Sequence, residues 1–497
     1  MKRNIIMTLL AVTMLTAAAQ KTVKLEFDKN SAQQRTLIMP DGQTVSYKAY
    51  ERLFYVTNVE DTVYQYMNVY VPEDANQKTP ILLRIYVGGY MAAAATEPQA
   101  GDATGRALKE GFVVAIPGAR GRNSTIVTDN TTRYTGRAPQ ALLDLKAAVR
   151  YLRMFDKQME GSADLIITDG TSAGGALSAL LGATGNNPAY EPMLKEMGAA
   201  DTHDDVFASI CFCPIIDLEH ADMAYEWLYN CTNNRSRPLT NEQSVASNEL
   251  AAMYPAYLNS LGLKHPETGD PITADNMRGY IKQLLIRSAQ AAKNVGADIP
   301  DAMGFSFNTP PTSPVPPSAS PDKLRVAAQV FNAQRSNAPA PNAQRGEYIV
   351  SLDLETYLNY IITAQPLKTP PAFDALGVNG ATATAENELF GDTLGTNVNF
   401  TDYAAMRNGK QVTPEVQEAV RLMNPMNFIN AKKTDVAKYW YIRHGARDRD
   451  TAFPVPIAFA TKLQNEGKQV NFLLAWNRPH SGDYALDELF EWMKSLK

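Results

Sequence analysis

The sequence predicts an α/β fold with a mostly parallel central sheet, because short apolar runs rich in β-formers alternate with helical patterns. Between residues 60 and 215 the predicted strands are 64–72, 80–89, 111–121, 163–170 and 206–217. The stretch "APQALLDLKAAVRYLRMF" (138–155) repeats apolar residues at the spacing of a helix. Near-continuous apolar strands separated by helices indicate a sheet that helices cover on both faces.

The alternation stops after Asp217. Residues 220–395 carry long polar and helical segments and the tract "FNTPPTSPVPPSASP", whose prolines fit an extended loop and not the interior of a sheet or helix. Predicted strands return at 437–445 and 468–476, each followed by a helical pattern. We therefore predict one core in two parts, residues 20–219 and 396–497, split by an inserted lid domain at 220–395.

The first residues, "MKRNIIMTLLAVTMLTAAAQ", have the features of a signal peptide. A basic start, a short apolar stretch and small residues up to Ala19 predict that residues 1–19 are removed and that the protein is exported, to a periplasm or beyond. No later run reaches eighteen apolar residues, so we expect no membrane span. The net charge of −5 argues against a nucleic-acid partner.

The chain has three cysteines, Cys211, Cys213 and Cys231. A chain of this length with so few cysteines does not depend on disulfides for its fold. Cys231 could pair with either of the other two, which would leave one thiol unpaired. In the segment "ASICFCPII" we expect burial as small hydrophobic side chains.

The stretch "TDGTSAGGALSAL" (168–180) places Ser172 between two glycines, each two positions away, after a predicted strand and before a segment suited to a helix. This pattern is typical of the nucleophile elbow of α/β-hydrolases, whose glycines let the backbone hold the serine hydroxyl out on a strained turn. The alternative is a small-residue turn that only packs a helix against the sheet, since the motif also occurs by chance.

A serine of this kind needs a histidine as base, and in α/β-hydrolases the order along the chain is serine, acid, histidine. Of the five histidines, His203 precedes its strand and His265 lies inside the insertion. His220 follows a predicted strand but does not fit the order of serine, acid and histidine. His444 precedes the candidate acids and would reverse the order of acid and histidine. His480 directly follows the last predicted strand, so we predict that it is the base, although a lone histidine near a C-terminus is more often without function.

The acid should follow the penultimate predicted strand, where "ARDRDTAF" offers Asp448 and Asp450. We expect one of them to meet the histidine while the other faces elsewhere. Either could instead cap the helix predicted from Thr451. Asp450 suits the capping role better by position, so we assign Asp448 to the triad.

Catalysis by such a triad also needs donors for the negative oxygen of the tetrahedral intermediate. One expected donor is the backbone N–H of Ala173, directly after the serine. The other is expected from "IYVGGYMAAA", where Gly88 and Gly89 follow a predicted strand and let the backbone approach closely. We choose the N–H of Gly89.

The segments "VGGYM", "GTSAGGALSALLGATGN" and the long block from "RHGARDRDTAF" to "HSGDYALDELFEWM" together resemble the bacterial tannases, the tannin acylhydrolases of the α/β-hydrolase superfamily. The resemblance covers most of the chain after the signal peptide and is weakest near the proline tract. It implies an α/β-hydrolase fold with a large inserted lid. It also implies a triad of Ser172, Asp448 and His480, which the order of the strands selects as well.

The resemblance further implies substrate-binding residues: Asp450, and from the lid Lys368 in "QPLKTPPAFDALG" and Glu386 in "ATAENELFG", with Glu388 as an alternative to Glu386. A lysine and two carboxylates can hold the adjacent phenolic hydroxyls of a galloyl group through charge-assisted hydrogen bonds. The alternatives are a surface lysine and a carboxylate at the start of a helix.

These observations predict an exported serine esterase that hydrolyses the galloyl esters of tannins and releases gallate. Its expected partner is a small phenolic ester. We expect no cofactor and no metal, because no cluster of ligands is evident. A feruloyl or other carboxylesterase of the same fold is the nearest alternative, and a serine peptidase or a non-catalytic binding module are the others. The alcohol half of the substrate and the oligomeric state stay open.

Overall fold

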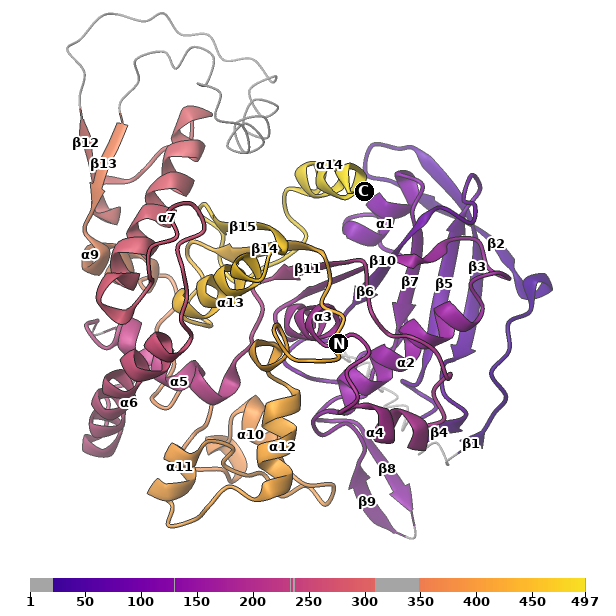
Figure 1. Cartoon of the computed structure of the whole chain (residues 1–497), viewed down its shortest axis with the longest axis horizontal. Helices are drawn as coiled ribbons and strands as arrows, with labels where there is room; N and C mark the ends of the chain where they lie inside the picture. Colours follow the sequence, from indigo (N-terminus) through magenta and orange to yellow (C-terminus); the bar gives the residue numbers. More distant parts are fainter. Residues whose placement is uncertain (1–20, 129, 233, 236, 309–347, 497) are drawn as a thin grey trace, which may run out of the picture.

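A nine-stranded sheet forms the centre of the molecule (Figure 1). The computed structural model describes residues 21–128, 130–232, 234–235, 237–308 and 348–496, so the predicted signal peptide and most of the proline tract lie outside the described residues. The strand order is β15-β14-β11-β10-β6-β7-β5-β3-β2. The bounds are β2 Gln33–Ile38, β3 Thr44–Phe54, β5 Tyr66–Pro72, β6 Pro80–Ile85, β7 Val113–Pro117, β10 Ser162–Thr171, β11 Ala208–Phe212, β14 Tyr439–Gly445 and β15 Gln469–Ala475.

The six strands from β15 to β7 pair in parallel, and β5, β3 and β2 extend the sheet in antiparallel pairs. This confirms the predicted α/β fold with a mostly parallel sheet. Parallel strands end at one common edge, so the loops after β6, β10, β14 and β15 meet there. Those loops carry Gly89, Ser172, Asp448 and His480.

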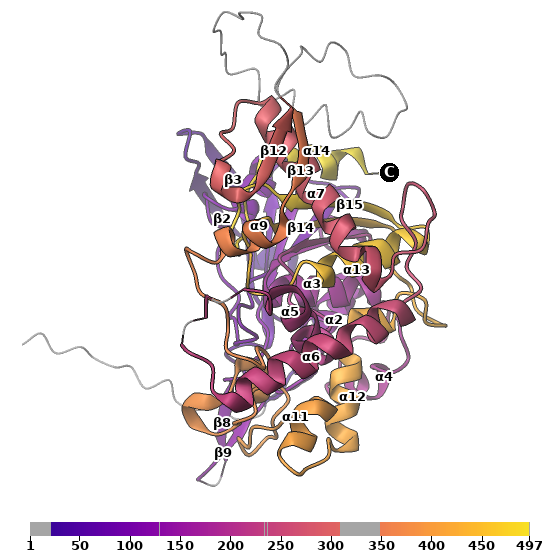
Figure 2. The same cartoon turned by 90° about the vertical axis from the view of Figure 1, so that its left-hand side faces the viewer.

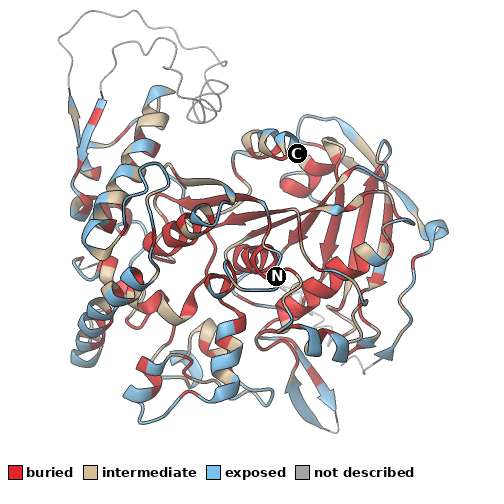
Figure 3. Cartoon of the chain, in the orientation of Figure 1, coloured by how far each residue is buried: buried red, intermediate tan, exposed pale blue. Residues whose placement is uncertain are grey.

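Helices cover both faces of this sheet. On one face lie α1 (Ala103–Lys109) and α14 (Leu486–Ser495), and on the other lie α2 (Gln140–Met154), α3 (Ala173–Ala183) and α13 (Pro454–Asn465) (Figure 1). Side chains alternate between the two cores: Tyr439 and Tyr441 of β14 pack on the first face, and Trp440 and Ile442 pack on the second. Strands β11 and β14 are therefore buried along their whole length (Figure 3).

The chain leaves the sheet after β11 and returns to it at β14. The α-helices in the described part of this segment are α5 Leu218–Tyr229, α6 Asn241–Ser260, α7 Ala274–Asn294, α9 Leu354–Ile361, α10 Ala385–Leu389, α11 Asp402–Arg407 and α12 Pro414–Leu422. Turning the molecule shows that α6 runs across its side (Figure 2). The predicted boundary at residue 219 falls inside α5, and the division into domains stays a prediction.

The remaining described elements are four 3-10 helices, Lys29–Ser31, Asp301–Met303, Gly380–Thr382 and Pro425–Asn427, together with one small α-helix and three short two-stranded sheets. The sheets pair β1 (Lys21–Thr22) with β4 (Asn58–Val59), β8 (Thr125–Thr128) with β9 (Thr131–Tyr134), and β12 (Phe305–Asn308) with β13 (Tyr348–Leu352), and the α-helix is α4 (Glu191–Glu196). Among the described residues no helix is both long and apolar enough to cross a membrane. All three cysteines are free thiols; Cys211 and Cys213 are buried, as expected, and Cys231 is exposed.

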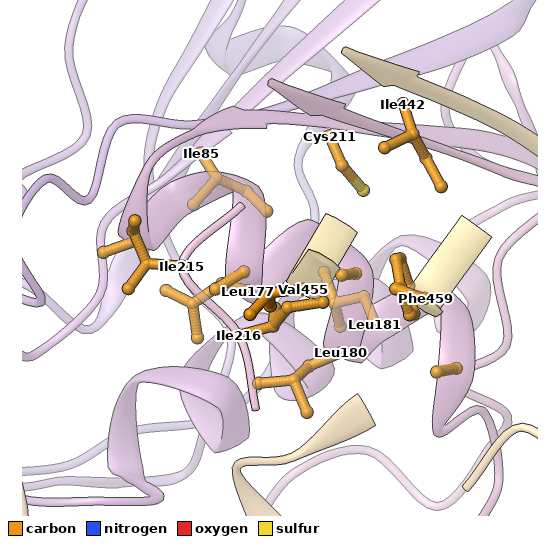
Figure 4. Packing of buried hydrophobic residues seen from close by; sticks show 14 of the residues in the cluster. Ile85, Leu177, Leu180, Leu181, Cys211, Ile215, Ile216, Ile442, Val455 and Phe459 are labelled. Atoms are coloured by element: carbon orange, nitrogen blue, oxygen red, sulfur yellow. The ribbon is translucent and has the colours of Figure 1, made fainter. Parts of the chain in front are cut away.

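Helix α3 packs close to the sheet, because its first turn consists only of alanine and glycine. Leu177, Leu180 and Leu181 fill the space under β11 and β14 (Figure 4). A Cβ atom on Gly170 would lie 2.2 Å from the carbonyl oxygen of Gly174, and one on Gly174 would lie 2.8 Å from the carbonyl oxygens of Ile85 and Val87. The two glycines therefore allow the contact between helix and sheet that fixes the turn at residue 172.

Gly174→Ala should lower the free energy of unfolding by about 1–3 kcal/mol, because the added methyl group meets backbone oxygens that cannot move aside. Gly279→Ala is the matched control, since Gly279 also lies in a helix but has open space around its Cα. That variant should be as stable as the unmodified protein or more stable by about 0.5–1 kcal/mol. Unfolding in urea measures both, and equal stability of Gly174→Ala and the unmodified protein would refute this explanation of the close contact.

Candidate active site

Ser172 occupies the turn between β10 and α3 in a backbone conformation that few side chains adopt. Its φ is 62° and its ψ is −122°. The Ser172 N–H donates to the Phe212 carbonyl at 2.9 Å, and the Ser172 carbonyl accepts from the Ile215 N–H at 3.3 Å. A positive φ at a non-glycine residue is strained and persists only where the surroundings impose it. The turn thus has the geometry expected of a nucleophile elbow.

His480 and Asp448 form a hydrogen-bonded pair on the loops after β15 and β14. The Nδ1 atom of His480 lies 2.7 Å from Oδ2 of Asp448. The Asp448 side chain is fully buried, and its Oδ1 accepts from the Asp450 N–H at 2.8 Å. Because Nδ1 faces the carboxylate, Nε2 is the ring nitrogen left to accept a proton from elsewhere.

The loop that carries His480 packs directly against the turn that carries Ser172. A Cβ atom on Gly482 would lie 1.9 Å from Oγ1 of Thr171, the residue before the serine. The end of β11 links the two segments. The Cys213 thiol donates to the Ser481 carbonyl at 3.3 Å, and the carbonyl of the preceding residue, Phe212, accepts from the Ser172 N–H. The predicted nucleophile, base and acid therefore lie on adjoining loops at one edge of the sheet.

The pair is polarised as a serine hydrolase requires. Burial alone would lower the pKa of His480, but the hydrogen bond to Asp448 and the charges of Asp448 and Asp450 raise that pKa above its usual value. Burial alone would raise the pKa of Asp448, but His444, His480 and the Asp450 N–H hold it at about 2. Asp448 is therefore ionised at neutral pH and stabilises a positive charge on His480.

A second histidine, His444, also lies beside Asp448. Its Nδ1 is 3.6 Å from Oδ2 of Asp448, its side chain is fully buried, and neither ring nitrogen has a hydrogen-bond partner. Burial lowers the pKa of His444, so this ring is neutral where His480 carries the proton. Sequence reasoning excluded His444 as the base because it precedes the acids, and gave no reason to expect it beside Asp448.

The two backbone N–H groups predicted as oxyanion donors lie on loops that follow neighbouring strands, β10 and β6. Ala173 is the first residue of α3, so its N–H has no partner within the helix. Gly89 has a φ of 54°, and the carbonyl before it, that of Gly88, accepts from the Met91 N–H at 2.9 Å. In the described part of the chain, neither the Ala173 N–H nor the Gly89 N–H donates to a protein acceptor.

The residues that the resemblance assigns to substrate binding also lie close to the pair. Lys368 donates from Nζ to the Asp450 carbonyl at 2.8 Å and lies 4.1 Å from the centre of the Phe373 ring. Burial raises the pKa of Glu386, on α10, while the charges of Lys368 and Arg122 oppose that shift. Lys368 thus connects the lid to the loop that carries Asp448.

Glu388, the alternative to Glu386, has a different partner. Its carboxylate forms an ion pair with the Arg122 guanidinium, and its backbone carbonyl accepts from Arg137. The charge of Lys368 acts on Glu386, whereas the carboxylate of Glu388 is already paired with Arg122. The arrangement favours Glu386 as the residue available to a ligand.

Two expectations for Asp450 are wrong. Its Oδ2 lies 3.8 Å from Nδ1 of His480, so Asp448 and Asp450 both approach the histidine; residues two apart in extended backbone share a face. Asp450 also does not cap the following helix, because α13 begins at Pro454 with Phe453 at its cap. Instead, Oδ1 of Asp450 accepts from Arg449 at 2.7 Å.

One group of metal-ligand type lies outside this site among the described residues: Asp217, Glu219 and His220. Its donor atoms are already occupied. Asp217 accepts from His220, from the Tyr257 hydroxyl at 2.6 Å and from the Asn424 amide at 2.7 Å, and the same amide donates to Glu219. Such a hydrogen-bonded network explains the grouping without an ion.

Comparison with known proteins begins with a family model described as BD-FAE, which matches residues 67–257. Esterase LipC of Mycobacterium tuberculosis is 39% identical over 74 residues, which are 15% of this chain and 18% of LipC. The probable carboxylic ester hydrolase LipM of the same organism is 26% identical over 174 residues, which are 33% of this chain and 37% of LipM. The chain thus spans well under half the length of these curated relatives.

Solved structures match over almost the whole length. The tannin acyl hydrolase of Lactobacillus plantarum is 35% identical with a TM-score of 0.81, and the match covers 95% of this chain and 98% of that one. The tannase of Fusobacterium nucleatum is also 35% identical, with a TM-score of 0.79 and coverage of 95% and 99%. Tannin acyl hydrolase has been solved with ethyl gallate and with 3,4-dihydroxybenzoate. Because sequence and fold agree over this length, the chain belongs to the tannase family and is a carboxylic ester hydrolase of the α/β-hydrolase type.

Proposed function

We propose that this enzyme cleaves galloyl esters through an acyl-enzyme formed on Ser172. The observation that carries the proposal is the 2.7 Å contact between Nδ1 of His480 and Asp448, on loops packed against the Ser172 turn. A buried carboxylate that orients an imidazole toward a serine on a strained turn is the arrangement needed for nucleophilic acyl transfer. Tannin acyl hydrolase binds ethyl gallate, which supports a galloyl ester as the substrate.

The reaction would proceed in two steps. His480 takes the proton of the Ser172 hydroxyl through Nε2, and the serine oxygen attacks the ester carbonyl. The negative oxygen is stabilised by the N–H groups of Ala173 and Gly89, and His480 returns the proton to the departing alcohol. Water then attacks the acyl-enzyme by the same proton transfers and releases gallate.

The galloyl ring would lie between the core and the lid, where Lys368, Glu386 and Asp450 surround it. The two carboxylates accept from phenolic hydroxyls, and Lys368 donates to a phenolic oxygen. An acyl group without these hydroxyls would leave buried charges without partners, which is how a polar pocket rejects analogues. A feruloyl ester has one of these oxygens blocked by a methyl group and should be a poorer substrate.

We also propose that the protein acts outside the cytoplasm after removal of residues 1–19. The support is the sequence pattern of the first residues alone. The N-terminal sequence of the secreted protein tests this proposal: Gln20 is the expected first residue, and an intact Met1 on secreted protein would contradict it.

Ser172→Ala should lower kcat for methyl gallate by about 10⁴-fold or more, because the nucleophile is lost while the pocket remains. Gallate release, followed by chromatography, measures this, and the exposed Ser306→Ala is the control that should keep full activity. Rates on methyl ferulate distinguish the nearest alternative. If methyl ferulate were the better substrate, or if Ser172→Ala retained activity, the proposed function would be wrong.

The activity should fall on acidification with an apparent pKa above 6.5, the usual value for histidine, because the pKa of His480 is raised and only its neutral form accepts a proton. Asp448→Asn removes the charge of Asp448 and the hydrogen bond to a carboxylate, the two largest of the interactions that raise this pKa, and leaves the charge of Asp450 in place. In that variant the acid limb of kcat/KM should move to lower pH, and kcat should fall by about 10⁴-fold. A pH profile of both proteins measures the shift; an acid limb that stays in place would show that Asp448 does not act on His480.

Glu386→Gln should lower kcat/KM for phenolic esters and leave kcat/KM for esters without phenolic hydroxyls unchanged. Loss of a charged acceptor for a phenol corresponds to about 1.5–3 kcal/mol, or about 10- to 100-fold in kcat/KM for methyl gallate. Methyl benzoate, which lacks the hydroxyls, should be hydrolysed by the variant and by the unmodified enzyme at similar rates. Equal losses on both esters would place Glu386 outside the ring pocket.

A further inference from the structure

Arg122 contacts both the loop of the predicted oxyanion donor and the lid helix that carries Glu386. It lies in the loop between β7 and β8. Its Nε donates to the Gly89 carbonyl at 2.8 Å, and its backbone N–H donates to the Tyr90 carbonyl at 2.8 Å. Its Nη1 forms the ion pair with Glu388 on α10, two residues after Glu386.

The loop around Gly89 needs such an external support. Gly89 and Tyr90 both have positive φ, 54° and 56°. Glycine tolerates this conformation but does not enforce it, since it is the most flexible residue in the chain. The bond from Arg122 fixes the peptide plane after Gly89, and the bond from Met91 to Gly88 fixes the plane before it. The Gly89 N–H lies in the plane that Met91 fixes, and Arg122 fixes the adjoining plane, so the backbone on both sides of Gly89 is held in place.

The backbone of the Arg122 loop packs tightly on the same segment. The Ala92 N–H donates to the Asn123 side chain at 2.7 Å. A Cβ atom on Gly121 would lie 2.1 Å from the Ala92 nitrogen. With the side chain of Arg122 only 18% exposed, the guanidinium has little freedom to leave its two partners.

Helix α10 contacts the same guanidinium, that of Arg122, through Glu388. Residues two apart on a helix point to roughly opposite sides, so Glu388 can pair with Arg122 while Glu386 faces the ligand. Among the described contacts, two other hydrogen bonds join α10 to the core. Arg137 donates to the Glu388 carbonyl, and the Ala138 N–H donates to the Leu389 carbonyl at 2.8 Å. The side chain of Asn387 bonds this five-residue helix to other parts of the insertion, and the carboxylate of Glu388 is its side-chain bond to the core among the described contacts.

We propose that Arg122 is a positioning residue that holds the phenol-binding helix α10 at a fixed distance from the oxyanion donor at Gly89. The inference rests on the proposed function, in which Glu386 binds the ring and Gly89 binds the ester oxygen. The guanidinium of Arg122 contacts both the Gly89 loop and α10, because its planar group can donate to two acceptors at once. It thereby sets the spacing between the ring and the ester carbonyl. Displacements of about 1 Å between bound groups reduce rates by about 100-fold, so this spacing matters for kcat.

The test compares two esters in four proteins. Methyl gallate uses both the ring pocket and the oxyanion donor, whereas p-nitrophenyl acetate has no ring on its acyl group and uses the oxyanion donor alone. Arg122→Gln should lower kcat at least about tenfold on both esters. Glu388→Gln keeps the bond from Arg122 to Gly89 and should lower kcat much more on methyl gallate than on p-nitrophenyl acetate. The double variant should be no worse on methyl gallate than Arg122→Gln alone, since both changes break one connection.

Arg122→Lys is the control that distinguishes a specific loss of activity from a general loss of structure. A lysine keeps the charge but has a single ammonium group, so it should restore thermal stability while recovering only part of kcat. Arg153→Gln is the matched control: Arg153 pairs with Asp164 and Asp205 away from the site, and its loss should leave both rates unchanged.

The outcomes separate this inference from the proposed function. If the unmodified enzyme cleaves p-nitrophenyl acetate but not methyl gallate, the proposed function fails. If it cleaves both, and Arg122→Gln retains its kcat on each, the role of Arg122 is overturned. Additive losses in the double variant would also overturn it, because they would show that Arg122 and Glu388 act separately.

Discussion

The buried carboxylate of Asp448 is the group on which the rest of the site depends. Removing a charge from water is costly unless hydrogen bonds and opposite charge compensate for it. Here the compensation comes from the His480 ring on one side and the Asp450 N–H on another. Each of these contacts also fixes geometry, so the requirement to satisfy one buried charge holds the His480 ring with Nδ1 toward Asp448.

The insertion between β11 and β14 takes part in this arrangement. Two buried tyrosines from it donate to the loop of the acid: Tyr357 of α9 to the Ala446 carbonyl at 2.6 Å, and Tyr229 of α5 to the Asp448 carbonyl at 3.3 Å. Lys368 adds its bond to the Asp450 carbonyl. The insertion therefore supports the backbone of the loop that carries Asp448, in addition to supplying Lys368 and Glu386, which are proposed to bind the ring. Changes in the lid can be expected to affect the rate of the chemical step as well as substrate binding.

The sequence predicted those features that follow from local pattern. The parallel strands were predictable because each is a continuous apolar run, and the turn at Ser172 because its glycines occupy fixed places. The strand β3 and the helices α6 and α7 were not singled out, since no motif marks them. Features that arise from tertiary contact were missed: His444 lies beside Asp448 although chain order excluded it as the base, and Arg122 joins two segments more than 260 residues apart. For Asp450, local spacing suggested a role that tertiary contacts do not support. Its position fitted a helix cap, but its side chain accepts from Arg449 and its carbonyl accepts from Lys368.

The central claim is that Ser172, His480 and Asp448 act as one unit, and covalent labelling tests it most directly. A fluorophosphonate reacts with a serine only as fast as its neighbours make that serine nucleophilic. Peptide mass spectrometry should find the adduct on Ser172 in the unmodified enzyme, and labelling of His480→Ala and Asp448→Asn should be slower by orders of magnitude. An adduct on another serine, or labelling of Ser172 at the same rate in all three proteins, would contradict the account.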